Sequence, residues 1–224
     1  MTFEEFKAQF DIFNLIDNAE KLEHCKKQYK SYLLRLEDEN YFEPEENSFE
    51  NDIVGQYEKN LSNIFKLDNI LESQFYFLVR PSFTPESLLI IDNIKGKFIL
   101  KYIILEENYW LVFYENNTIL DVKKIILTTG LDKTTGLKIF ALLEKVMVEA
   151  IPKKGNGFTL DGTVFKISRK LNGEIQSVTK HSPSETSKPA KVISILFQLI
   201  DNIDTLEGNL LLDIENQIDK LRDE

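Results

Sequence analysis

Two dipeptides in the C-terminal third of the chain, Asp161-Gly162 and Asn172-Gly173, constrain its fold more than any other feature. Asp-Gly and Asn-Gly favour the positive φ angles of two-residue hairpin turns, and both lie here among short runs rich in β-branched and aromatic residues. The sequence therefore predicts a compact antiparallel β-meander that begins at Gly157 and ends before His181.

The segments on either side of this meander have a helical period. Apolar residues recur at helical spacing over 134–150, and Pro152 comes next as a stop signal. After the meander, Pro189 stands where the first turn of a helix tolerates proline, and Gly208 separates that helix from a final amphipathic one. We expect the final helix to carry an apolar stripe made of Leu211, Ile214, Ile218 and Leu221.

The middle of the chain has an extended pattern. Runs of β-branched and aromatic residues alternate with short groups of turn residues, and such short connections make neighbouring strands antiparallel. The predicted strands span 74–80, 87–92, 97–105, 109–114 and 118–127.

The N-terminal part is predicted to be helical and acidic. Thr2 and Glu5 have the spacing of a capping box at the start of a first helix, and a second helix is expected over 14–37. Residues 37–58 contain nine acidic residues and neither Lys nor Arg, which is typical of a solvated connection. A short helix over 60–67 precedes the first strand.

Together these patterns predict an α+β fold. It has N-terminal helices, an antiparallel β-sheet of about five strands, then a helix, the β-meander and C-terminal helices. Residues 1–69 make a helical acidic N-terminal segment, and residues 70–224 make an α+β domain. No linker rich in Gly, Ser or Pro separates Leu127 from the helix expected over 134–150, so we expect one cooperative unit.

Composition limits the compartment and the partners. The formal net charge of −10 disfavours sequence-independent nucleic-acid binding, which depends on Lys and Arg contacts to phosphates. The single cysteine, Cys25, excludes an internal disulfide and a Cys-based zinc cluster and suits a reducing compartment. The N-terminus is acidic where a secretory signal is basic, and the longest apolar stretches are too short to span a membrane. We therefore expect a cytoplasmic protein with no nucleic-acid and no membrane partner.

The two histidines, His24 and His181, limit where a histidine-dependent catalytic site can lie. His24 is next to Cys25, but consecutive helical residues point about 100° apart, so we interpret Cys25 as a core residue. His181 lies beside Ser182 and, across the meander, is expected near Asp161, which together supply the residue types of a hydrolase triad. The sequence has neither a Gly-x-Ser-x-Gly turn nor a phosphate-binding glycine loop, and we predict no cofactor and no metal site.

Charge is distributed unevenly along the chain. Residues 151–200 are basic on an otherwise acidic protein, and we favour pairing of these cations with acidic helices inside the fold over an exposed basic patch. The acidic connection is the more natural docking surface, because acidic groups steer a basic partner towards the protein. The candidate partner-binding residues are Glu43, Glu45, Glu46, Glu50 and Asp52.

The order of motifs supports a resemblance to known proteins. Arg80-Pro81-Ser82-Phe83 ends a predicted strand, further strands continue up to Trp110, and Leu160-Asp161-Gly162-Thr163-Val164-Phe165 and Ser182-Pro183 precede the last helical region. This order over residues 70–205 resembles a loose group of uncharacterised bacterial α+β proteins, some of which resemble immunity proteins of polymorphic toxin systems. The resemblance implies a small acidic cytoplasmic inhibitor that binds a toxin. Its motifs are structural, so no functional residue is carried over.

The sequence supports three functional hypotheses. The first is a non-enzymatic binding protein, an immunity-type inhibitor that acts by protein–protein binding to a basic toxin. The second is a hydrolase-type enzyme that uses Asp161 and His181. The third is a homo-oligomeric structural or assembly protein, a homodimer joined through the stripe of the final helix.

Overall fold

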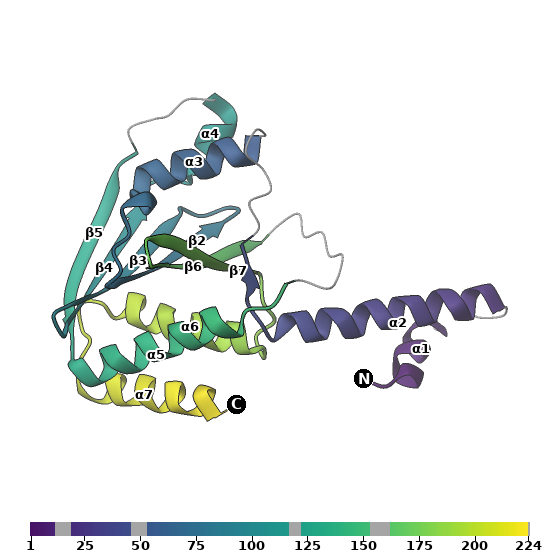
Figure 1. Cartoon of the computed structure of the whole chain (residues 1–224). Helices are drawn as coiled ribbons and strands as arrows, with labels where there is room; N and C mark the ends of the chain where they lie inside the picture. Colours follow the sequence, from purple (N-terminus) through teal and green to yellow (C-terminus); the bar gives the residue numbers. More distant parts are fainter. Residues whose placement is uncertain (12–18, 46–52, 117–121, 153–161, 224) are drawn as a thin grey trace.

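The computed structural model describes residues 1–11, 19–45, 53–116, 122–152 and 162–223. These residues form a mixed α/β fold in which one open, seven-stranded antiparallel sheet lies between two layers of helices (Figure 1). The predicted fold class is confirmed. The sheet has seven strands where about five were predicted. The C-terminal hairpin and the two-residue strand Glu43–Pro44 join it, and one of the five predicted strands is a helix.

The strand order along the sheet is β1-β7-β6-β2-β3-β4-β5, and each neighbouring pair is antiparallel. The pairing of β6 with β2, which sets Phe77 opposite Ile167, joins the C-terminal hairpin to the central strands. The strands are β1 (Glu43–Pro44), β2 (Gln74–Pro81), β3 (Ser87–Ile94), β4 (Lys97–Leu105), β5 (Lys124–Leu131), β6 (Thr163–Leu171) and β7 (Glu174–His181).

Of the two predicted hairpin turns, the second is confirmed. Asn172 and Gly173 connect β6 to β7 with φ angles of 52° and 85°, the positive values that a two-residue hairpin turn requires. The first predicted turn includes Asp161, which lies outside the described residues, as does the strand expected before it. Gly162 is described and stands just before β6.

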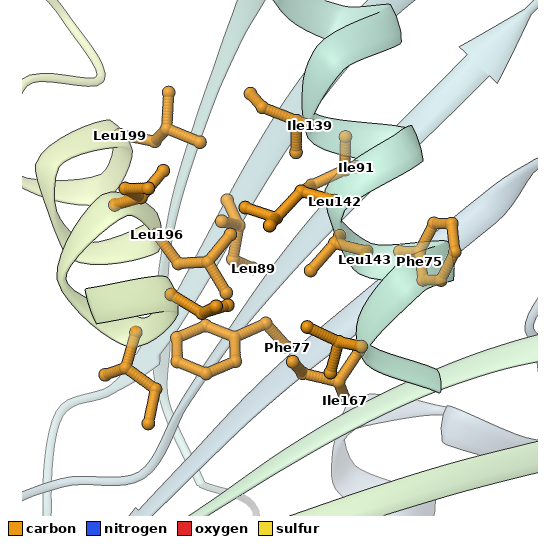
Figure 2. Packing of buried hydrophobic residues seen from close by; sticks show 14 of the residues in the cluster. Phe75, Phe77, Leu89, Ile91, Ile139, Leu142, Leu143, Ile167, Leu196 and Leu199 are labelled. Carbon is orange, nitrogen blue, oxygen red and sulfur yellow. The ribbon is translucent and has the colours of Figure 1, made fainter. Parts of the chain in front are cut away.

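One face of the sheet is covered by α5 (Lys133–Glu149), α6 (Lys188–Asp201) and α7 (Gly208–Asp223). Figure 2 shows side chains of α5 and α6 pointing towards Phe77 and Leu89 on the sheet. Helix α7 packs on α5 and α6, and its Ile214 and Ile218 are fully buried. The apolar stripe expected to join two copies is therefore largely part of the core of one chain.

The opposite face is covered by α3 (Ile53–Phe65), a 3₁₀ turn (Leu67–Asn69) and α4 (Tyr109–Asn116). These elements form a second core with the outer side chains of the central strands. Both faces of β2 and β3 are thus buried, which explains their nearly continuous apolar runs. The buried members of this core are Tyr57, Leu61, Phe65, Ile70, Tyr76, Leu78, Leu88, Ile103, Leu105, Tyr109 and Phe113.

The strand predicted over 109–114 is wrong, because these residues form helix α4. Other boundaries shift without a change of type. The strand expected over 118–127 overlaps β5 (Lys124–Leu131), and residues 118–121 of that prediction lie outside the described residues. The short helix expected over 60–67 is α3, which begins at Ile53.

The first two helices form an arm that extends away from the sheet (Figure 1). They are α1 (Phe3–Asp11), which begins with the predicted capping box of Thr2 and Glu5, and α2 (Ala19–Glu39). Rings from the two helices pack together, and Cys25 is buried as expected. Lys180 of β7 donates to the backbone carbonyl of Asp38 at 2.5 Å, which fixes the base of the arm. No helix in the described segments is both long and apolar enough to cross a membrane.

Gly136, near the start of α5, allows this helix to lie directly on β4. A β-carbon at this position would lie 2.2 Å to 2.7 Å from ring atoms of Phe98, which is buried. We therefore expect Gly136→Ala to lower the free energy of unfolding by about 1–3 kcal/mol in urea denaturation, although alanine is the better helix former. Gly130→Ala is the control, since a β-carbon there meets nothing within 4 Å. Equal losses in the two variants would contradict the steric explanation.

Candidate protein-binding surface around helix α4

The start of α4 is fixed by a buried carboxylate. Glu86, which precedes β3 and is fully buried, accepts hydrogen bonds from the backbone N–H groups of Tyr109 and Trp110 at 2.7 Å and 2.9 Å. These groups belong to the first turn of the helix, where free N–H donors and the helix dipole favour a negative charge. The Tyr57 hydroxyl of α3 donates to the same carboxylate at 2.6 Å. Glu86 therefore joins α3, α4 and the sheet.

Two neighbouring side chains strengthen this arrangement. Burial and, after it, the negative charge of Glu86 raise the pKa of the Tyr57 phenol, so the phenol stays protonated and remains a donor. Asn108 accepts a hydrogen bond from the N–H of Leu111 at 2.9 Å and donates one to the carbonyl of Thr84 at 2.6 Å. The β2–β3 loop is thereby tied to the N-terminus of α4.

Large apolar side chains of this helix and of the loop tied to it face solvent. Phe83, next to Thr84 in the tied loop, is 73% exposed, and on α4 the exposed fractions are 46% for Leu111 and 64% for Tyr114. Trp110 is half-buried, with its ring centroid 5.0 Å from that of Tyr57 and 6.1 Å from that of Tyr114. We call Phe83, Trp110, Leu111 and Tyr114 the α4 surface. A group of exposed apolar side chains on a fixed scaffold is typical of an interaction site.

Acidic side chains flank the α4 surface. Glu106 and Glu107 precede α4, Glu115 lies near its end, and all three are exposed. An apolar centre with a charged edge is the usual layout of a protein–protein interface. This surface fits a partner that has an apolar pocket surrounded by basic residues.

A small cavity of about 100 Å³, lined by both charged and apolar side chains, lies between α3 and the sheet. Arg80 and Lys166 line it, and each already has an acidic partner. Arg80 bonds Glu58, and Lys166 bonds Glu45 at 2.7 Å. Because each cation is neutralised inside the fold, the cavity has no surplus positive charge for an anionic ligand.

The predicted partner-binding acids divide into two groups. Glu45 pairs with Lys166, and Glu43 lies 3.2 Å from the ammonium group of Lys180. These pairs match the expectation that the basic C-terminal segment is complemented within the fold. The remaining acids, Glu46, Glu50 and Asp52, lie outside the described residues.

The residues of the hydrolase hypothesis are only partly described. His181 ends β7 opposite Val164, and its ring packs close to the backbone of Gly162. Asp161 lies outside the described residues, so its distance from His181 stays a prediction. His24 is exposed on the arm, with its ring nitrogen 3.5 Å from the Gln28 amide.

The comparisons with known proteins add no assignment: no family model, curated protein or solved structure matches the chain. Across the described segments, no three His, Cys, Asp or Glu side chains converge as a group of metal ligands. The α4 surface therefore stands on its own geometry as the candidate site. The sequence pattern did not predict the α4 surface, because residues 109–114 have the composition of a strand.

Proposed function

We propose that this chain is a protein-binding protein and that the α4 surface is its main contact with a partner. The observation that carries the proposal is the group of exposed aromatic and aliphatic side chains on a helix held by a buried carboxylate. Interfaces are enriched in Trp, Tyr and Phe, whose rings bury a large area while few rotatable bonds are immobilised. Because the position of α4 is already fixed, less conformational entropy is lost when a partner binds.

The charge of the protein defines the chemistry of the partner. The three acids beside the α4 surface and the formal net charge of −10 attract a basic protein and raise its association rate, an effect that salt screens. The sequence resembles a loose group of uncharacterised bacterial proteins, some of which resemble immunity proteins of polymorphic toxin systems. A basic toxin that reaches the cytoplasm is therefore the first partner to test. In this proposal Glu46, Glu50 and Asp52 act as steering charges.

The test compares two double variants with the wild type in affinity capture from lysate of the source cell. Phe83→Ser with Tyr114→Ser removes the most exposed rings of the α4 surface. Val148→Ser with Leu212→Ser is the matched control, because it changes two exposed apolar side chains on α5 and α7. We expect wild type and control to retain the same stoichiometric basic protein and the α4 double variant to lose it.

The captured protein is then purified and its affinity is measured. Loss of hot-spot rings with a combined effect of about 2 kcal/mol raises the dissociation constant roughly 30-fold. Circular dichroism confirms that the variants are folded. If the α4 double variant binds as tightly as the wild type, the α4 surface is not the contact.

A further inference from the structure

The two edges of the sheet differ in how they are protected. At one edge, β1 is only two residues long and contains Pro44, which has no N–H to donate. At the other edge, β5 is eight residues long, contains no proline and pairs with β4 without a bulge. In Figure 1, β5 lies along the outer side of the sheet. Long, flat, apolar edge strands are the ones that accept another strand.

The backbone groups available on β5 are set by its pairing with β4. The Lys123 carbonyl accepts a hydrogen bond from the N–H of Glu106 on the β4 side at 3.1 Å, so the polar groups of Lys123 face β4. Backbone groups alternate along an antiparallel strand, so those of every second residue point away from β4. The N–H and C=O groups that face outward belong to Lys124, Ile126, Thr128 and Gly130.

The side chains of β5 favour addition of a strand. Ile125 and Ile126, which lie on opposite faces of the sheet, are 50% and 52% exposed, although they belong to a regular strand. Lys124 is the only charged residue within the strand. The described part of the chain places no other strand beside β5.

We propose that a second copy of this chain occupies the edge, so that β5 pairs with β5 of its partner antiparallel around a two-fold axis. In an antiparallel pair, residues directly opposite each other have their side chains on the same face of the sheet. The N–H and C=O groups that point away from β4 in one copy must also meet those that point away from β4 in the other. Pairing centred on Thr128 meets both requirements, with Ile126 opposite Gly130 and Lys124 opposite Asp132. The sheets of the two copies become one continuous sheet.

Charge complementarity favours this register and this occupant. The Asp132 carboxylate accepts hydrogen bonds from the N–H groups of Thr134 and Thr135 and therefore stays ionised at the end of β5. The backbone of Asp132 is extended, so the strand geometry continues to this residue. Within its own chain the Lys124 ammonium group donates to the backbone carbonyl of Ile64 at 2.5 Å, a bond that leaves its positive charge in place. Symmetry then brings Lys124 of each copy opposite Asp132 of the other, which gives one attractive pair at each end of the joined strands. This inference is independent of the proposed α4 contact.

The test uses Thr128→Pro in the full chain. The Thr128 N–H faces away from β4, so proline removes an edge donor without removing a bond of the β4–β5 pair, and edge strands tolerate proline at such positions. We expect the wild type to sediment at twice 26.1 kDa at micromolar concentration. Thr128→Pro should raise the dimer dissociation constant roughly tenfold or more, because both central hydrogen bonds are lost.

Two further variants and a hydrogen-exchange measurement make the result specific. Lys124→Asp places like charges opposite each other at both ends and should also weaken the dimer, whereas Phe83→Ser with Tyr114→Ser should leave its mass unchanged. Hydrogen exchange should show concentration-dependent protection of the Ile126, Thr128 and Gly130 amides. A wild type that stays monomeric, or a dimer in which these amides remain unprotected, would overturn the proposal. If the wild type is monomeric, any strand that pairs with β5 must come from a different protein.

Discussion

Replacing Glu86 with alanine is expected to lower the free energy of unfolding by about 3 kcal/mol or more, because a buried donor left without an acceptor costs about 1–3 kcal/mol. Three donors depend on this carboxylate: the Tyr57 hydroxyl and the backbone N–H groups of Tyr109 and Trp110. Urea unfolding measures the loss. Trp110 is the only tryptophan and belongs to α4, so its fluorescence reports directly on this helix.

Two variants separate the role of the carboxylate from general effects of substitution. Glu86→Gln keeps an acceptor oxygen of similar shape and should lose less stability than Glu86→Ala. Glu106→Ala removes an exposed acid nearby and should stay within about 0.5 kcal/mol of the wild type. If Glu86→Ala matched Glu106→Ala in stability and left the Trp110 emission unchanged, the carboxylate would not be what holds α4.

Partner binding should depend on the same network. When α4 loses its N-terminal acceptor, Leu111 and Tyr114 are no longer held in one arrangement, although neither is substituted. The entropy of ordering them is then added to the cost of binding. Glu86→Gln should therefore weaken partner affinity less than Glu86→Ala does, in the same order as the two losses of stability.

The elements that were predicted correctly have causes that lie within a few residues. The capping box of Thr2 and Glu5, the hairpin turn at Asn172 and Gly173, and the early proline of α6 all act over one turn of chain. Such signals can be recognised from a single sequence because they need no knowledge of the fold. The joining of β6 to β2 has no such local signal, so the extent of the sheet was underestimated.

Helix α4 shows why the candidate site escaped prediction. The run from Tyr109 to Tyr114 is rich in aromatic residues and resembles a strand in composition. Its helical state is supported by Glu86, which is 23 residues from Tyr109 in the chain. A local signal was present, since Asn108 is a favourable residue for a helix N-cap, but composition outweighed it.

The predicted acidic contacts show a related limit. Glu45 and Glu43 belong to a stretch without counter-charge in the sequence, but they meet Lys166 and Lys180, which are 121 and 137 residues away. Local charge counting treats such carboxylates as available to a partner. Pairing across the sheet shows that part of the acidic connection holds the fold together, whereas the exposed acids beside α4 remain available for steering.

Helix α7 allows a matched test of core against surface. Ile214 is fully buried against the other helices, and Leu212, two residues earlier on the same helix, is 57% exposed. Ile214→Ala is expected to lower the free energy of unfolding by about 2–5 kcal/mol, through lost burial and the cavity left behind. Leu212→Ala should change it by no more than about 0.5 kcal/mol. Urea denaturation of the two variants gives the comparison.

The same pair of variants distinguishes a core stripe from a dimer interface on α7. If the stripe joined two copies, Ile214→Ala would lower the molecular mass in solution, and the stability loss would depend on protein concentration. If the stripe is core, as its burial indicates, the loss is independent of concentration and any dimer formed through β5 keeps its mass. A concentration-dependent loss in Ile214→Ala alone would place the contact between copies on α7 and not on β5.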